Sequence, residues 1–182
     1  MDILYIVGRG SGWNNNELRY SLRSLDKHGI NVGRIFIAAP ELPDFINQKA
    51  VTWVPADDPT DRNHKNIQHK VERAIYGSDI GDHFLLSSDD HFYVRDTDFD
   101  NYPYYKKGNL PTQLTENHNN GYWESLVNTR KILERFALGT FSTNPHCNTH
   151  YDKQAYIENQ LLMDTGYLSK AGAEVNCMMG NI

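Results

Sequence analysis

Short apolar runs alternate with longer amphipathic segments through the first half of the chain, and this limits the folds open to it. The runs predict strands at 3–7, 32–39, 51–55 and 82–87. Leucines at helical spacing before Gly29 predict one helix, and a similar pattern from Asn63 to Gly77 predicts a second. Strands that alternate with helices in this way indicate an α/β fold with a mainly parallel sheet flanked by helices.

The second half is less regular. Residues 99–113 are rich in Tyr, Pro, Gly and Lys, which is typical of a long ordered loop or an irregular hairpin. Helices are expected at 121–138 and 151–168, with a turn-rich segment at 140–149 between them. Because no linker or repeat marks a boundary, we expect a single domain over 1–182, with a nucleotide-sugar-binding half at 1–95 and an acceptor half at 96–182.

Composition narrows the function classes. The net charge of −5 over 182 residues gives no overall attraction to nucleic acid or to an anionic membrane. The two cysteines, Cys147 and Cys177, form no CxxC pair, which favours reduced thiols in a cytosolic protein. The segment MDILYIVG is predicted to be a core strand rather than an export signal. No run approaches the ~18 apolar residues of a membrane span, so we expect a cytoplasmic protein.

Two adjacent carboxylates follow the fourth predicted strand, in FLLSSDDHFYV (84–94). Ser88, Asp89 and Asp90 are expected at the carboxyl end of that strand, where open α/β sheets bind ligands. Neighbouring carboxylates repel each other unless a cation or several donors offset their charge. Mg²⁺ and Mn²⁺ prefer oxygen ligands and often share carboxylates with nucleotide phosphates. The pair therefore suggests a metal-diphosphate site, and the alternative is a helix cap or a solvated turn.

Five segments carry a family resemblance: ELRYSLRSL (17–25), RIFIAAPELPDFI (34–46), VTWVPADD (51–58), NHKNIQHKVERA (63–74) and FLLSSDDHF (84–92). Here the chain resembles glycosyltransferases of the GT-A type, whose sheet ends in a short acidic "DxD" motif. It resembles more closely the second conserved region of the Stealth family, sugar-phosphate transferases of capsule synthesis. The resemblance covers roughly the first half of the chain. It implies a GT-A-like, Rossmann-like fold, a nucleotide-diphosphate sugar as donor, and Mn²⁺ or Mg²⁺.

The chain departs from the Stealth pattern in three places. The loop after the first strand reads VGRGSGW (7–13), where the family usually has an aspartate in a "WVDG"-like motif. Ser88 stands where that family often has Asn, and Lys65 and Gln68 stand in register with its Ser-His and Glu. These departures leave two transferred groups open, a sugar or a sugar phosphate.

Carried over position by position, the resemblance makes Asp90 the direct metal ligand. Asp89 would bind beside it or hydrogen-bond the donor. A late histidine often completes the metal shell of such enzymes, and His146 and His150 are the candidates, with surface histidines as the alternative. An inverting mechanism also needs a base near the acceptor. Glu116 is the residue chosen for it, with His118 and Glu124 as other candidates.

Further candidate residues are expected around the donor. The loop with Gly8, Arg9, Gly10 and Ser11 would approach the nucleotide, although its alternating glycines do not match GxGxxG and a flexible turn is the alternative. Two more groups follow the third strand. Asp57 and Asp58 would lie near the base, and a helix cap is the alternative. The diphosphate would lie near Arg62, Asn63, Lys65 and Asn66, and a solvated basic face is the alternative.

The favoured interpretation is a metal-dependent glycosyltransferase that moves a sugar from a nucleotide-diphosphate sugar to an acceptor. The acceptor would be a glycan, or a modified DNA base in a phage setting. The alternatives are a Stealth-like sugar-1-phosphate transferase and a domain that binds nucleotide sugar without catalysis. Aromatic residues at 102–105 and 122–123 would stack on sugar rings or lie in the core. The sequence predicts no oligomeric state.

Overall fold

The computed structural model describes residues 1–9, 11–114, 121–142 and 147–164. The chain divides into two compact units, Met1–Pro103 and Tyr104–Ile182, and each is described by itself. This division falls a few residues after the boundary expected between the two halves. Whether the units form the single domain expected from the sequence stays a prediction.

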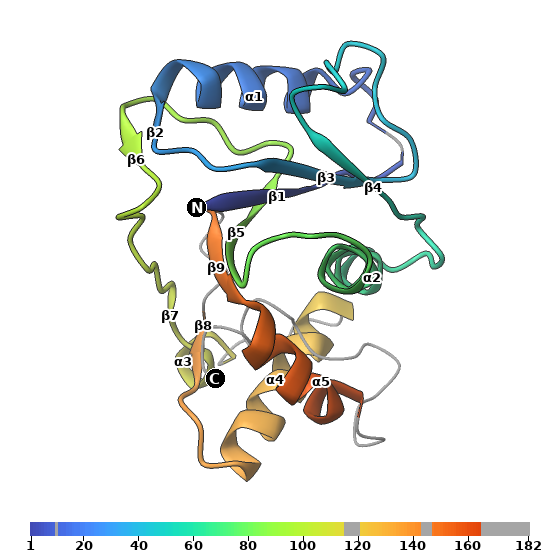
Figure 1. Cartoon of the computed structure of the whole chain (residues 1–182). Coiled ribbons are helices and arrows are strands. Elements are labelled where there is room, and N and C mark those ends of the chain that lie inside the picture. Colours follow the sequence, from blue (N-terminus) through green and yellow to red (C-terminus); the bar gives the residue numbers. More distant parts are fainter. Residues whose placement is uncertain (10, 115–120, 143–146, 165–182) are drawn as a thin grey trace. The chain divides into compact units, whose positions relative to one another are not determined.

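The first unit contains a parallel sheet with the strand order β4-β3-β1-β5 (Figure 1). The chain moves outward from β1 through β3 to β4, then returns to place β5 on the other side of β1. This reversal is the topological switch point of open α/β sheets. The predicted α/β, Rossmann-like class is therefore confirmed for this unit. The strands are β1 (Asp2–Ile6), β3 (Ile35–Ala39), β4 (Thr52–Pro55) and β5 (His83–Ser88).

One helix covers each face of this sheet (Figure 1). Helix α1 (Asn16–His28) buries Leu18 and Leu25 in a cluster with alternate residues of the strands, including Ile3 and Tyr5. Helix α2 (Asn63–Gly77) packs on the other face through Val71 and its inward neighbours. Because side chains alternate across a strand, strands covered on both faces must be apolar at nearly every position, as the sequence pattern indicated.

The start of α1 has no side-chain cap. The helix begins at Asn16, but the Asn15 side chain makes no capping hydrogen bond. Asn14 and Asn15 have φ values of 54° and 55°, a left-handed conformation that asparagine tolerates. The Ser11 side chain instead binds the backbone that precedes the helix, because its Oγ accepts hydrogen bonds from Trp13 N at 3.2 Å and from Asn15 N at 2.9 Å. At the other end, Gly29 caps the helix as predicted, with its N–H bonded to Leu25 O.

Short elements complete both units. In the first, β2 (Gly29–Ile30) pairs in parallel with β6 (Thr97–Asp98). The second contains α4 (Gly121–Arg135) and α5 (Lys153–Asp164), close to the two predicted helices, and residues 165–168 of the latter prediction lie outside the described residues. Among the described residues no helix is long and apolar enough to cross a membrane. The remaining elements are β7 (Gly108–Asn109), α3 (Leu110–Gln113), β8 (Phe141–Ser142), antiparallel to β7, and β9 (Thr149–Asp152).

Candidate functional site

The carboxyl edge of the sheet collects most of the predicted site residues of the first unit. Because the four strands are parallel, the segments that follow them emerge at the same edge. Ile6 of β1 is in register with Ser88 of β5, so the acidic turn and the loop after β1 leave the sheet side by side. The segment after β4 emerges two strands away from β1. These three segments, 8–15, 56–62 and 88–91, are called the edge site below.

The acidic turn concentrates negative charge. Asp89 is partly buried in the turn that follows β5, whereas Asp90 is exposed. Burial raises the pKa of the Asp89 carboxyl above its ordinary value, and the charges of Asp90 and Glu17 raise this pKa further. The predicted repulsion within the pair is therefore present. The turn itself is closed by a hydrogen bond from His91 N to Ser88 O at 3.3 Å. Ser88 N also donates to His91 Nδ1 at 3.3 Å.

Helix α1 holds the chain that leaves this turn. Ser21 Oγ donates to His91 O at 2.5 Å, and Tyr93 N donates to Ser24 Oγ at 2.9 Å. Tyr5 of β1 lies below Ser21, with 3.2 Å between the two hydroxyl oxygens. Ser21 and Tyr5 are fully buried, and burial raises the pKa of the Tyr5 phenol well above its usual range. A neutral hydroxyl network thus connects β1 and α1 to the acidic turn.

The loop after β1 is tied to the end of β4 through Arg9. Its backbone N–H donates to Asp58 Oδ2 at 2.8 Å, and its guanidinium Nη2 lies 2.7 Å from Asp57 Oδ1. The side chains of Arg9 and Asp57 are both largely exposed. Ser11 Oγ donates to Glu17 Oε2 at 2.8 Å, so Glu17 braces this loop by a hydrogen bond. Gly10 lies outside the described residues.

Asp58 also pairs with a buried lysine that the sequence analysis missed. Lys70 is 1% exposed and its Nζ forms an ion pair with Asp58 Oδ1. Partial burial raises the pKa of Asp58, but the hydrogen bonds from Lys70 and from Arg9 N outweigh it, and the net pKa is lowered. The available signal was helical spacing, because Lys70 falls one turn after Asn66 and one turn before Ala74, all on the buried face of α2.

The predicted diphosphate residues at the start of α2 divide into two sets. Asn66 is buried, and its amide bonds to Thr60, with 3.1 Å from Thr60 N to Oδ1 and 2.8 Å from Nδ2 to Thr60 O. It therefore shapes the preceding loop. Asn63 and Lys65 are exposed and Arg62 is half-exposed, all in or next to the first turn of the helix. These three side chains remain at the surface near the helix N-terminus.

Most of the catalytic and metal-binding residues predicted in the second half lie outside the described residues. Glu116, His118 and His146 lie outside the described residues. His150 stacks on Tyr104, with ring centroids 3.8 Å apart and an interplanar angle of 17°. Glu124 is in the first turn of α4. Across the described ranges, no group of three or more His, Cys, Asp or Glu side chains is placed to hold a metal ion. The carboxylates brought together at the edge site are Asp89 and Asp90, with Glu17 acting on Asp89.

No family model matches the chain. A segment of 86 aligned residues, which covers 44% of the chain, is 36% identical to the exopolysaccharide phosphotransferase CpsY of Mycobacterium leprae. The match spans only 16% of the length of that relative. The chain is thus similar, over somewhat less than half of its length, to a part of a phosphotransferase of exopolysaccharide synthesis.

Proposed function

We propose that the chain is a transferase, or a part of one, that moves a sugar phosphate from a nucleotide-diphosphate sugar to a glycan acceptor. The observation that carries the proposal is the acidic turn, which lies beside the loop after β1 at the switch point of a parallel sheet. Open α/β sheets bind their ligands at this place. The partial identity to an exopolysaccharide phosphotransferase supports phosphate transfer over sugar transfer.

Asp89 and Asp90 fit a divalent cation. Their oxygens are the donors that Mg²⁺ and Mn²⁺ prefer, and the pKa of Asp89 is raised first by burial and then by the negative charges of Asp90 and Glu17, which a cation would offset. Two carboxylates suffice for such an ion, because Mg²⁺ commonly fills its other positions with water and substrate phosphate. When bound, the ion would stabilise negative charge on the donor diphosphate. Glu17 would remain a neighbour that keeps this position electronegative.

The rest of the edge site would hold the nucleotide. Arg9 is bound to Asp57 by an exposed ion pair, and such pairs contribute only about 0–1 kcal/mol. The guanidinium is therefore free to exchange Asp57 for a donor phosphate, which it would bind through two parallel hydrogen bonds. Arg62 and Lys65 lie where an anion would also meet the N-terminus of α2. Asp58, neutralised by Lys70, would position the loop and would not contact the donor.

Sugar transfer from the same donor is the second candidate. The parallel sheet and the acidic turn support sugar transfer as much as sugar-phosphate transfer, because both reactions begin from a nucleotide-diphosphate sugar. They differ in the bond that breaks. Sugar transfer breaks the bond between the sugar and its phosphate and releases a nucleoside diphosphate, whereas sugar-phosphate transfer breaks the diphosphate and releases a nucleoside monophosphate. A modified DNA base stays a less favoured acceptor, since the net charge of −5 does not attract DNA.

The released nucleotide tests the proposal. The protein is incubated with a panel of nucleotide sugars, a mixture of glycans and Mn²⁺, and the products are separated by ion-exchange chromatography. We expect a nucleoside monophosphate, and at least a hundredfold loss of its release in Asp90→Asn. Asp82→Asn is the matched control, because Asp82 is exposed and directly precedes β5, at the end opposite to the acidic turn. Release of a nucleoside diphosphate would favour sugar transfer.

Binding tests the cation separately. Calorimetry with the nucleoside diphosphate is expected to show Mn²⁺-dependent affinity that Asp90→Asn removes and Asp82→Asn retains. Equal affinity with and without a chelator would exclude the cation. Cation-dependent binding without release of any nucleotide would favour the non-catalytic binding domain.

A further inference from the structure

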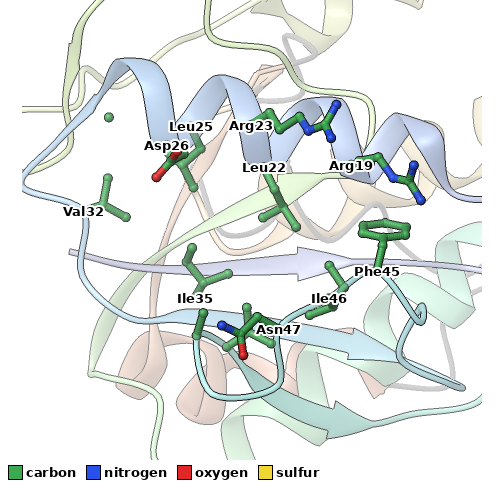
Figure 2. Close-up of a pocket in the computed structure, with 13 residues that line it drawn as sticks. Arg19, Leu22, Arg23, Leu25, Asp26, Val32, Ile35, Phe45, Ile46 and Asn47 are labelled. Atoms are coloured by element: carbon green, nitrogen blue, oxygen red, sulfur yellow. The ribbon is translucent and has the colours of Figure 1, made fainter.

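A cavity lies in the first unit, between α1 and the segment 45–51 (Figure 2). Its volume is about 590 Å³, within the range of small-molecule pockets. The edge site is made by the segments after β1, β4 and β5, and none of its residues lines this cavity. The lining comes from α1 (Arg19, Leu22, Arg23, Leu25, Asp26), from the chain between α1 and β3 with the first residue of β3 (Gly29, Val32, Ile35), and from the segment before β4 (Phe45, Ile46, Asn47, Ala50, Val51).

Most of the wall is aliphatic. Leu22, Ile35 and Ile46 project into the space between the helix and the strand (Figure 2). These side chains pack against the core on one side and are only partly buried, so part of each apolar surface faces the cavity. An apolar surface of this kind gains free energy when an apolar ligand removes it from water.

Two arginines give one end of the cavity a positive charge. Arg19 and Arg23 are one helical turn apart on α1, and both line the cavity. Arg19 packs its guanidinium over the Phe45 ring, 4.4 Å from the centroid, and its Nε is buried without a hydrogen-bond partner. In the part of the chain that the structure describes, neither arginine forms an ion pair.

We propose that this cavity binds an amphipathic organic anion, with its phosphate or carboxylate group at Arg19 and Arg23 and an unbranched alkyl chain along Leu22, Ile35 and Ile46. Both guanidiniums line the cavity, and neither has a carboxylate partner in the described part of the chain, so an anionic group would offset their charge. Arginine binds such groups through its planar fork of donors. The wall beyond the two arginines is aliphatic, apart from Asn47 and the exposed Asp26, which fits an alkyl chain. The ligand is not the nucleotide of the edge site, and the inference does not depend on the proposed function.

Calorimetry with octyl phosphate, below its micelle concentration, tests the site on the full chain. We expect saturable binding at one site, at least tenfold tighter than octanol or octyltrimethylammonium. Affinity should rise roughly threefold to fourfold for each methylene added between hexyl and octyl phosphate, as burial of an alkyl group predicts. Equal binding of octyl phosphate and octanol, or no binding of either, would overturn the proposal.

Variants locate the binding. Arg19→Met and Arg23→Met keep the apolar stem of each side chain and should each weaken octyl phosphate at least fivefold, while Arg19→Lys should recover part of the loss. Lys27→Met is the matched control, since Lys27 is an exposed cation on α1 that does not line the cavity. It should bind as the parent does. Far-ultraviolet circular dichroism confirms that each variant is folded, and unchanged binding in both arginine variants would contradict the assignment.

A substitution that fills the cavity separates ligand binding from self-association. Ala50 is an exposed lining residue, so Ala50→Phe should block the chain without disturbing the core, and octyl phosphate binding should be lost. Sedimentation velocity of the parent and of Ala50→Phe completes the test. If the parent forms a concentration-dependent dimer that Ala50→Phe abolishes, the groove is covered by a second copy and the small-anion site is wrong.

Discussion

Two aspartates that are adjacent in the sequence, Asp57 and Asp58, have different partners in the structure. Asp57 and Asp58 follow β4 together, and both were predicted to lie near the base of the nucleotide. The structure places Asp57 at the surface with Arg9, whereas Asp58 is 16% exposed and pairs with the buried Lys70. A buried lysine tolerates its charge only while a partner offsets it, so Asp58 stabilises the fold in a way that Asp57 does not.

Removal of the Asp58 charge should therefore destabilise the protein far more than removal of its neighbour. Asp58→Asn leaves the Lys70 ammonium buried without an anion, and we expect the free energy of unfolding to fall by roughly 3 kcal/mol. Asp57→Asn breaks an exposed pair and should change it by less than about 1 kcal/mol. Urea denaturation followed by tryptophan fluorescence measures both. Equal losses in the two variants would mean that Lys70 does not depend on Asp58.

At the scale of the element, α1 combines three roles. Its leucines anchor it on the sheet, its serines bind the chain after the acidic turn, and its arginines line the cavity together with Leu22 and Leu25. The leucine spacing was readable from the sequence because burial repeats with the helical period. The serine contacts were not, because Ser21 and His91 are 70 positions apart and a serine in a helix is usually assigned to the surface.

Substitution of Ser21 tests whether α1 positions the acidic turn. Ser21→Ala leaves the His91 carbonyl and the Tyr5 hydroxyl without this partner, so unfolding free energy should fall by about 1–2 kcal/mol. If the turn is displaced as well, Mn²⁺-dependent nucleotide affinity should fall several-fold. Lys27→Ala, on the exposed face of the same helix, should leave the affinity unchanged. A loss of stability with full affinity in Ser21→Ala would show that the serine has only a structural role.

Element positions were more predictable than side-chain contacts. The four strands of the sheet and α2 match their expected ranges closely, because strands buried on both faces produce continuous apolar runs. The predicted strand at 32–39 begins later, at Ile35, since Asn31 has a left-handed φ of 57° and Gly33 packs against the Met1 carbonyl. The acidic turn was predicted because two adjacent carboxylates directly follow an apolar run, at the end of a strand where open α/β sheets bind ligands. Lys70 and Ser21 were missed because their partners are remote in sequence.

Across the first unit, charged groups gather at both edges of the sheet with opposite consequences. At the carboxyl edge, the pKa of Asp89 is raised by burial and by the negative charge of Asp90. At the amino edge, Arg34 neutralises its neighbours, with 2.8 Å from Nη2 to Asp2 Oδ2 and 2.6 Å from Nη1 to Asp79 Oδ2. Asp2 also accepts N–H groups from Arg34 and Gly81. This cluster joins the starts of β1 and β3 to the segment before β5, so these charges stabilise the amino edge of the sheet.

The amino-edge cluster should make the stability of the protein depend on pH through Asp2. Burial raises the pKa of Asp2, but its hydrogen bonds with Arg34 and Gly81 outweigh this and hold the pKa below its ordinary 3.8. A carboxyl with a lowered folded-state pKa stabilises the protein above the unfolded-state value, and this contribution is lost as the pH falls through the folded-state value. Asp2→Asn should therefore lower the unfolding free energy by roughly 1–2 kcal/mol at pH 7.

The deficit of Asp2→Asn should shrink as the pH falls below about 3.8, because the parent carboxyl then becomes protonated and loses the same interaction. Urea midpoints of the parent and the variant, measured between pH 2.5 and 7, give this difference directly. Asp79→Asn is the control, since Asp79 binds the same arginine but is 77% exposed, and its unfolding free energy should stay within about 0.5 kcal/mol of the parent at every pH. A deficit in Asp2→Asn that is constant over this range would mean that the lost contacts act through shape and not through the charge of the carboxylate.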